Sequence, residues 1–449
     1  MNRNLTLELM RWKDRKPRKP LVLRGARQVG KTYILKTFGE AAFPRYHYFN
    51  FEEDERLGKV FEKNLRPEQI LTELQFHRNC SIDKGSDLII LDEIQRCPRA
   101  LTSLKYFAEE MPELALCTAG SLLGVCLGSE SFPVGKVTFL DLMPLTFEEF
   151  LAGTDSSRLA ELLSATDLSA PLPETAHDQL WEMWKRYLVV GGLPEVVNAY
   201  AARQDNLYEA MQAARKTQRD LLETYVADIA KHSGKTSALH IERLWKNVPE
   251  QLALAQDGSA PKFKFRGSLP NIRGYERIAG PLDWLENAKL VVRVSIVNSI
   301  GTPLSSCRAE NRFKLYFFDT GLLCAISGIL PATILEYGFG AYQGYVAENF
   351  VAQELLASGI VSLYAWQGKS AEVEFMIESA GGAVPLEVKS GRVTQSKSLG
   401  VFEHKFHPAR SYVLSARNIA RSNTRNYVPV YAAGCLSRNV LAATGGDNG

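Results

Sequence analysis

Eight residues near the start of the chain constrain its fold more than any other stretch: Gly25-Ala26-Arg27-Gln28-Val29-Gly30-Lys31-Thr32. Two glycines at this spacing let the backbone curl so that successive N–H groups point inward at an anion, beside the positive end of the next helix. An apolar run, residues 20–24, precedes the loop, and a helix-compatible run, residues 33–38, follows it. A strand, a phosphate-type loop and a helix in this order predict an α/β fold built on a parallel sheet.

The pattern up to residue 150 agrees with this fold. Short apolar runs alternate with helical periodicity, as in a parallel sheet whose strands are covered on both faces. We therefore predict a first domain over residues 1–150. Its candidate strands are Pro20–Arg24, Tyr46–Phe51, Asp87–Leu91, Leu114–Thr118 and Val137–Leu140.

The 449 residues are too many for one ordinary core, and length alone suggests about three domains. Residues 152–176 are rich in Ser, Thr, Ala and Pro, which predicts a surface connection and a boundary near 150–178. Helical periodicity followed by two apolar strands, Lys289–Ser295 and Lys314–Phe318, predicts a helical and winged-helix-like region over residues 178–335. Residues 336–449 form the third predicted domain, also α/β. Its elements are a helix over 344–357 and strands near 361–366, 373–377, 384–389 and 411–414.

The loop predicts a site for ATP with Mg²⁺. Its backbone, with Tyr33 at the start of the helix, would cradle the phosphates, while Lys31 reaches the β and γ oxygens. The Thr32 hydroxyl is expected on the metal ion. Arg24 and Arg27 could steer phosphate, although solvated arginines are the commoner case.

A phosphate loop needs an acidic partner, and the apolar strand before Asp92-Glu93 provides one at its carboxyl end, where α/β sheets bind ligands. We expect Asp92 to hold Mg²⁺ and Glu93 to polarise the attacking water. The alternative is that both carboxylates cap the following helix. Residues 114–121 form another apolar run that ends in polar residues. Ser121, or less favourably Thr118, could therefore orient that water. A helix-capping serine explains the same pattern.

Taken together, these motifs resemble a large prokaryotic family of AAA-like P-loop ATPases (AAA_14 type) with a C-terminal domain of unknown function (DUF4143 type). The resemblance implies ATP hydrolysis and extends over most of the chain. Relatives usually carry Gly-Arg where this chain has Gly135-Lys136, and lysine does not reproduce the bidentate fork of arginine. The matching segments are 24–32, 49–52, 91–95, 120–121, 142–150, 191–194, 284–285, 315–323 and 387–391.

Four C-terminal residues resemble the metal-binding core of PD-(D/E)xK nucleases. They are Glu348 on a predicted helix, Glu374 on a strand, and Glu387 and Lys389 on the next strand. Alternate strand residues share a face, so Glu387 and Lys389 point the same way. The carboxylates could hold Mg²⁺ while Lys389 helps a water attack a phosphodiester. The competing interpretation is that these charged residues simply alternate along the strands of a half-exposed sheet, with their side chains in solvent. Aspartate is commoner in that family where this chain has Glu374.

Charge and cysteine usage add little about partners. The net charge of +3 gives no global case for nucleic acid, so DNA contact would depend on a local basic surface. Such a surface is conceivable in the middle region, although a winged helix that contacts only protein fits nearly as well. The residues considered for it are Lys262, Lys264, Arg266, Arg273 and Arg277.

Seven scattered cysteines without a C-x-x-C pair are expected to be reduced thiols. The first ten residues lack the apolar core of a signal peptide, and no apolar run reaches the length of a spanning helix. We therefore expect no membrane contact and a cytoplasmic location.

Two hypotheses follow for the whole chain. In the first, the nucleotide state of an ATPase domain controls a nuclease-like C-terminal domain that interacts with DNA. In the second, the C-terminal domain is an inactive scaffold for protein partners. A small-molecule kinase is disfavoured because Glu93 beside Asp92 suits water as the acceptor. A homo-oligomer is compatible with the sequence, which does not fix the oligomeric state.

Overall fold

The computed structural model describes residues 3–121, 123, 135–233, 235–256, 262–265, 268–269, 274–336, 342–391, 396–422 and 424–442. The chain divides into two compact units. The first, called the N-terminal unit, comprises the residues up to Met143 together with Asn287–Lys289. The second, the C-terminal unit, comprises Pro144–Glu286 and the residues from Leu290 onward.

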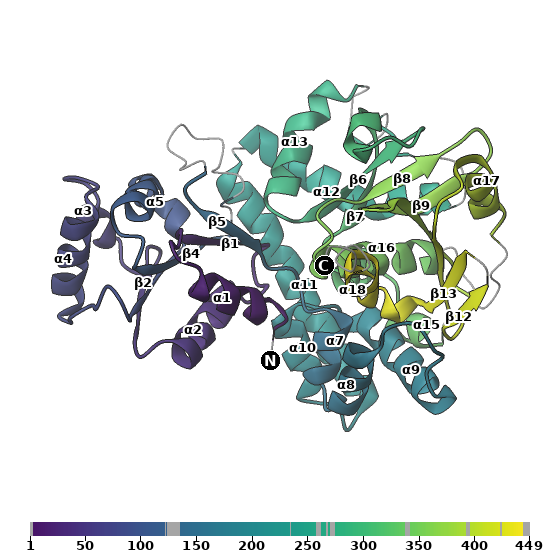
Figure 1. Cartoon of the computed structure of the whole chain (residues 1–449), viewed down its shortest axis with the longest axis horizontal. Coiled ribbons are helices and arrows are strands. Elements are labelled where there is room, and N and C mark those ends of the chain that lie inside the picture. The colour runs from purple at the N-terminus through teal and green to yellow at the C-terminus, as the bar shows by residue number, and fades with distance from the viewer. Residues whose placement is uncertain are drawn as a thin grey trace, which may run out of the picture. The chain divides into compact units, whose positions relative to one another are not determined.

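A five-stranded parallel sheet forms the centre of the N-terminal unit, in the order β2-β3-β4-β1-β5 (Figure 1). All five predicted strands are present, with ends shifted by a few residues, and every pairing is parallel. This confirms the predicted α/β class. The strands are β1 (Leu21–Arg24), β2 (Tyr46–Asn50), β3 (Leu88–Asp92), β4 (Ala115–Ala119) and β5 (Thr138–Asp141).

Helices cover both faces of this sheet, which explains why its central strands are continuously apolar. One hydrophobic core joins side chains of β1 to β4 with those of α4 and α5, while α2 contacts β2, β3 and β4. Figure 1 shows α1 and α2 on the other side of the strands from α5. The helices are α1 (Leu5–Asp14), α2 (Lys31–Ala42), α3 (Leu57–Val60), α4 (Pro67–Arg78), the 3₁₀ helix η1 (Ile94–Arg96) and α5 (Pro98–Glu110).

The strand order determines where polar residues meet. Because the strands are parallel, the carboxyl ends of β1, β4 and β3 lie in a row at one edge of the sheet. The phosphate-type loop follows β1, Asp92 ends β3, and Gly120-Ser121 follow β4. Residues far apart in the sequence are thus brought to one edge, where open α/β sheets bind ligands.

The C-terminal unit contains most of the helices, among them α8 (Ser157–Ala165) inside the stretch predicted as a surface connection. That prediction missed the helix because it rested on the Ser, Thr, Ala and Pro content of the whole stretch 152–176, whereas Ala160 and Leu163 of the helix are buried. Helix α7 begins with a capping box in which Thr146 and Glu149 satisfy each other's backbone N–H groups. The remaining helices are α7 (Phe147–Ala152), α9 (Glu174–Val190), α10 (Pro194–Ala201), α11 (Leu207–His232), α12 (Lys235–Gln256), α13 (Glu276–Asn287), α14 (Thr320–Ile326), α15 (Pro331–Leu335), α16 (Tyr342–Ala357), α17 (Lys397–Phe406) and α18 (Cys435–Ala442), with 3₁₀ helices η2 (Leu304–Cys307) and η3 (Val430–Ala432).

A mixed eight-stranded sheet completes this unit, in the order β12-β13-β11-β10-β9-β8-β6-β7. The predicted C-terminal strands appear as β8 to β11, whereas β12 and β13 were not predicted. The strands are β6 (Val291–Val297), β7 (Arg308–Phe317), β8 (Tyr364–Gln367), β9 (Glu372–Ser379), β10 (Gly382–Val388), β11 (Ser411–Ser415), β12 (Ala420–Ser422) and β13 (Arg425–Pro429).

The two strands expected to form a wing belong to this same sheet. β6 and β7 form an antiparallel pair, and the other edge of β6 pairs in parallel with β8. Five of the seven residues of β6 are buried, so the strand is an interior one and not an exposed wing. The boundary drawn at 335/336 therefore falls inside one continuous sheet.

A buried carboxylate, Asp319, ties α9 to α14. Its Oδ2 accepts from the Gly192 backbone N–H at 2.7 Å, and its Oδ1 accepts from Leu322 N at 2.9 Å, capping α14. Gly191 has a φ of 77°, and a Cβ there would meet the Asp319 carboxylate, so glycine is required. Burial raises the pKa of Asp319 to about 6, although its N–H partners favour the charged form.

This raised pKa predicts a pH-dependent stability. The folded protein holds the Asp319 proton more tightly than the unfolded chain does, whose pKa is near 3.8. Between roughly pH 4 and 6 the free energy of unfolding should therefore fall as pH rises, and Asp319→Asn should remove this component. Denaturant titrations of both proteins across this range measure it. A difference between them that does not vary with pH would contradict the assignment.

Among the described residues, no helix combines the length and apolar character needed to cross a lipid bilayer.

Candidate active site

The loop between β1 and α2 is built around its own lysine. Gln28 and Gly30 take left-handed backbone conformations, with φ of 63° and 94°. The buried Lys31 side chain donates hydrogen bonds from Nζ to Gly25 O at 3.0 Å and to Ala26 O at 2.7 Å. The backbone thus curls as the glycine spacing predicts, and an ammonium group is placed over the loop in front of α2.

Arg3, which the sequence did not single out, anchors the loop. Its guanidinium donates from Nη1 to Val29 O at 3.0 Å and from Nη2 to Met143 O at 2.6 Å. The side chain is buried and joins the loop to the segment that follows β5. No sequence signal distinguishes such an arginine from a solvated one, because its partners are distant backbone carbonyls.

Asp92, at the end of β3, joins three parts of the site. Its Oδ2 accepts from Thr32 Oγ1 at 2.6 Å and from the Tyr48 hydroxyl at 2.9 Å, while its Oδ1 accepts from Glu93 N at 3.0 Å. The side chain is buried. The threonine hydroxyl and the acidic residue predicted to share a cation therefore lie in direct contact, across 60 residues of sequence.

Tyr48 is a second residue that the sequence did not reveal. It lies on β2, and Asn50 Nδ2 donates to its hydroxyl at 3.2 Å. Burial and the neighbouring Asp92 charge raise the pKa of Tyr48 far above its ordinary value, so its hydroxyl keeps its proton. Lys36 Nζ lies 3.7 Å from the centroid of the Tyr48 ring, which adds a cation–π contact from α2. An aromatic residue in a strand usually indicates packing, which is why its hydroxyl was overlooked.

Glu93 follows in a left-handed conformation, with φ of 49°. Its carboxylate makes no capping hydrogen bond to η1, so the helix-capping interpretation is not observed for this residue. Instead, Oε2 accepts from Gln95 Nε2. The base predicted from sequence is thus half-buried at the sheet edge beside Asp92.

Ser121 is buried directly after β4, at the same edge. Residue 122 and most of the following segment lie outside the described part of the chain, so its capping alternative is untested. Thr118 Oγ1 donates to Leu21 O at 3.2 Å, which commits that hydroxyl to the contact between β4 and β1. Of the two candidates, Ser121 keeps the position expected for a water-orienting residue.

Several residues near the loop have partners other than a phosphate. Arg24 makes a two-point contact with Asp141, at 2.9 and 2.8 Å, and Arg27 lies 3.8 Å from Glu52. Tyr33 is 56% exposed. These contacts favour structural roles for both arginines in the state described.

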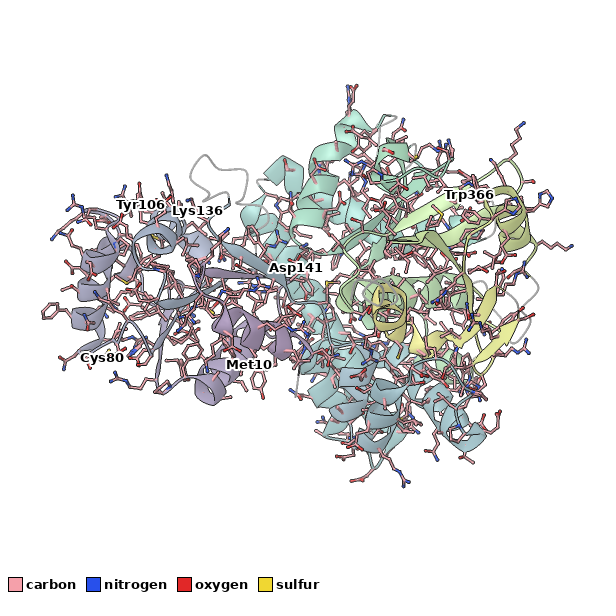
Figure 2. All side chains as sticks on the ribbon, viewed as in Figure 1. Met10, Cys80, Tyr106, Lys136, Asp141 and Trp366 are labelled. Carbon is pink, nitrogen blue, oxygen red and sulfur yellow. The ribbon has the colours of Figure 1, made fainter. Side chains whose placement is uncertain are left out.

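Lys136, which stands where relatives carry an arginine, pairs with Glu109 of α5 at 2.9 Å. Figure 2 labels Lys136 and also Tyr106, which lies on the same helix as Glu109. Both partners are more than one-third exposed, so this is an ordinary surface ion pair of little energetic weight.

In the C-terminal unit, the four predicted nuclease-like residues form one cluster. Glu374 Oε2 accepts from Val388 N at 3.2 Å, Glu387 Oε2 accepts from Leu399 N at 3.1 Å, and Lys389 pairs with Glu387 at 2.6 Å. Glu348 of α16 interacts electrostatically with Glu374. The four side chains therefore lie in one place, and their role as a metal site stays a prediction.

The cluster also contains Lys314 and Tyr316 of β7, which the sequence did not reveal. Lys314 is 4% exposed, contacts Glu372 and lies 3.7 Å from Glu348. The Tyr316 hydroxyl donates to Glu348 Oε2 at 2.7 Å. These residues were missed because β7 joins the sheet from the region assigned to a wing.

Burial and neighbouring charges shift the pKa of some members of the cluster. Burial alone would lower the pKa of Lys314, but Glu348, Glu372 and Glu374 outweigh it and hold that pKa above its ordinary value. Burial and the negative charges of Glu348 and Glu387 raise the pKa of Glu374 to about 8. In the part of the chain that the structure describes, no group of three or more His, Cys, Asp or Glu side chains is arranged to hold a metal ion.

Only three of the five residues considered for a basic surface in the middle region lie within the described ranges. Lys262, Lys264 and Arg277 are exposed. Arg266 and Arg273 lie outside the described ranges.

Comparison with known families identifies three segments. Residues 17–151 match the family model of an AAA domain, residues 182–333 match a domain of unknown function (DUF8612), and residues 343–432 match another (DUF4143). The chain therefore carries an ATP-binding AAA-like domain and a DUF4143 domain, as the sequence motifs predicted. The search of curated proteins found no match.

Solved structures share low identity with the chain. The Walker-type ATPase PABY2304 of Pyrococcus abyssi is 15% identical, with 72% of this chain and 94% of that chain covered and a TM-score of 0.45. Cdc6p from Pyrobaculum aerophilum is 14% identical (74% and 92% covered, TM-score 0.27). The RuvB Holliday junction branch migration motor of Thermotoga maritima is 16% identical (65% and 87% covered, TM-score 0.25).

Proposed function

We propose that the chain is a Mg²⁺-dependent ATP hydrolase whose nucleotide state governs a C-terminal scaffold that binds a partner without cleaving nucleic acid. The observation that carries the first part is the contact of Thr32 with Asp92, beside Glu93 and the Lys31 loop. This set provides a phosphate cradle, a pair of oxygen ligands and a carboxylate base at one sheet edge.

Each residue has a distinct role in this proposal. The loop backbone over residues 25–30 and the start of α2 at Tyr33 receive the phosphates, and the Lys31 ammonium exchanges its loop carbonyls for phosphate oxygens. Thr32 and Asp92 would hold Mg²⁺, which supplies positive charge to the phosphate oxygens. Glu93 accepts the proton of the attacking water, and Ser121 helps to orient that water.

Product analysis tests this function. Purified protein with ATP and Mg²⁺ should release inorganic phosphate and ADP, and EDTA should stop the reaction. A phosphorylated small molecule in place of free phosphate would identify a kinase instead. Absence of turnover under saturating ATP, with nucleotide bound, would overturn hydrolysis.

Lys314 favours the scaffold over a nuclease as the second part of the proposal. Its buried ammonium stands among the carboxylates that a nuclease would use for a divalent cation, and it already compensates their charge. Burial and the charges of Glu348 and Glu387 raise the pKa of Glu374 to about 8, so a metal ion would have to displace a proton from this group.

A cleavage assay separates the two hypotheses. Wild-type protein with Mg²⁺ and ATP is expected to leave supercoiled plasmid intact, and Glu387→Ala and Lys389→Ala are expected to match wild type in cells. Plasmid nicking that both substitutions abolish would establish the nuclease. Retention of plasmid DNA on a filter without cleavage would support DNA as the partner of the scaffold.

A further inference from the structure

Gln95, two residues after Glu93, has no role in the function proposed so far. Its Nε2 donates to Glu93 Oε2. A carboxylate oxygen can only accept, so this contact fixes which end of the amide is N–H. The hydrogen bond holds the Glu93 side chain at the sheet edge where Asp92 and Thr32 meet.

The other end of the same amide is the carbonyl oxygen Oε1. Gln95 Oε1 is buried, and among the described residues it receives no hydrogen bond. A buried carbonyl oxygen without a donor costs about 1–3 kcal/mol, and ordered water is the usual partner of such groups. An acceptor that lacks a donor therefore lies two bonds away from the nitrogen that holds the proposed base.

Gly120 leaves the space that this acceptor occupies. A Cβ at position 120 would overlap Gln95 Oε1. Gly120 directly follows β4 and precedes Ser121, so the amide lies between the end of β3 and the end of β4. This is the same edge to which the loop after β1 belongs.

The chemistry of hydrolysis supplies the missing donor. An attacking water has two O–H groups, one of which passes its proton to the base, while the other needs an acceptor that fixes the water's orientation. We propose that Gln95 is a positioning residue for ATP hydrolysis: its N–H aligns Glu93 and its Oε1 accepts the second hydrogen bond of the attacking water.

No bond to Gln95 is made or broken in this step. The water oxygen bonds to the γ-phosphorus, the bond from that phosphorus to the bridging oxygen of ADP breaks, and the water proton passes to Glu93. The inference rests on the proposed ATP hydrolysis and adds a residue to that site.

Gln95→Met tests the role, because methionine keeps the length and removes both hydrogen-bonding groups. We expect kcat to fall about tenfold to a hundredfold, as for a misplaced reacting group, while KM for ATP and the affinity for a non-hydrolysable analogue stay within about twofold. Gly120→Ala, which pushes the unchanged amide aside, should lower kcat in the same way. Gln69→Met, at an exposed glutamine of α4, is the matched control and should leave both constants unchanged.

A parallel Glu93→Gln variant separates failure of this inference from failure of the proposed function. If Glu93→Gln loses turnover while Gln95→Met and Gly120→Ala keep wild-type kcat, the positioning role is wrong and hydrolysis stands. If Glu93→Gln also keeps full turnover, the proposed hydrolysis site is wrong as well. Equal loss of analogue affinity and of kcat in Gln95→Met would show that Gln95 has a structural role only. If Gln95→Met does not fold, the kcat of Gly120→Ala tests the positioning role in its place.

Discussion

Glu93→Gln is expected to bind ATP with near wild-type affinity and to hydrolyse it about a thousandfold more slowly, since a positioned general base contributes about 10²–10⁴. The amide keeps the size of the side chain but does not take a proton from water. The Asp92 and Thr32 contacts are unaffected, because Asp92 bonds to the Glu93 backbone N–H and not to its side chain.

Single-turnover phosphate release and binding of a fluorescent ATP analogue measure the two effects separately. Lys31→Ala is the complementary variant, because it removes the ammonium that bridges the loop and should abolish nucleotide binding itself. Lys136→Ala, at the exposed pair with Glu109, serves as the matched control for loss of a lysine. Wild-type turnover in both Glu93→Gln and Lys31→Ala would reject the site.

Lys314→Met should destabilise the C-terminal unit by about 3–5 kcal/mol, the usual cost of breaking a buried ion pair by removing one partner. The ammonium is 4% exposed and stands between Glu348 and Glu372. Without it, the charges of the buried Glu348 and the partly exposed Glu372 are uncompensated.

Denaturant titration of wild type and Lys314→Met measures this effect. Lys246→Met is the matched control, because Lys246 pairs with Glu242 at 2.6 Å on the surface of α12 with half its side chain exposed. That pair should contribute less than about 1 kcal/mol. Equal and small losses for both lysines would mean that Lys314 does not compensate the cluster. Full recovery in the double variant Lys314→Met, Glu372→Gln would assign the cost to Glu372 alone.

Local patterns predicted the parts of the molecule whose structure depends on neighbouring residues. The strand and helix around the loop, the acidic end of β3 and the five parallel strands follow from apolar runs and glycine spacing, which act over a few residues. The same holds for the break at Gly191-Gly192, where Gly191 takes φ of 77°. The helix α8 was not predicted, because the surrounding stretch is rich in serine and alanine. The helix packs through two buried side chains, which composition alone does not reveal.

Contacts between distant residues decided the rest. Arg3, Tyr48 and Lys314 look ordinary in sequence, and their roles come from partners 26 to 140 residues away. The two strands predicted to form a wing belong to a larger sheet, because the second edge of β6 pairs with β8.

The sequence alone therefore determined the phosphate loop, its acidic partners and the α/β class of the N-terminal unit, since these are encoded in short runs of residues. Only the tertiary structure decided that Lys314 pairs with Glu348 and Glu372, and that Gln95 holds Glu93 while its own Oε1 receives no hydrogen bond from the described residues. Burial and charge compensation depend on which chain segments meet in space, and periodicity along one segment does not carry that information.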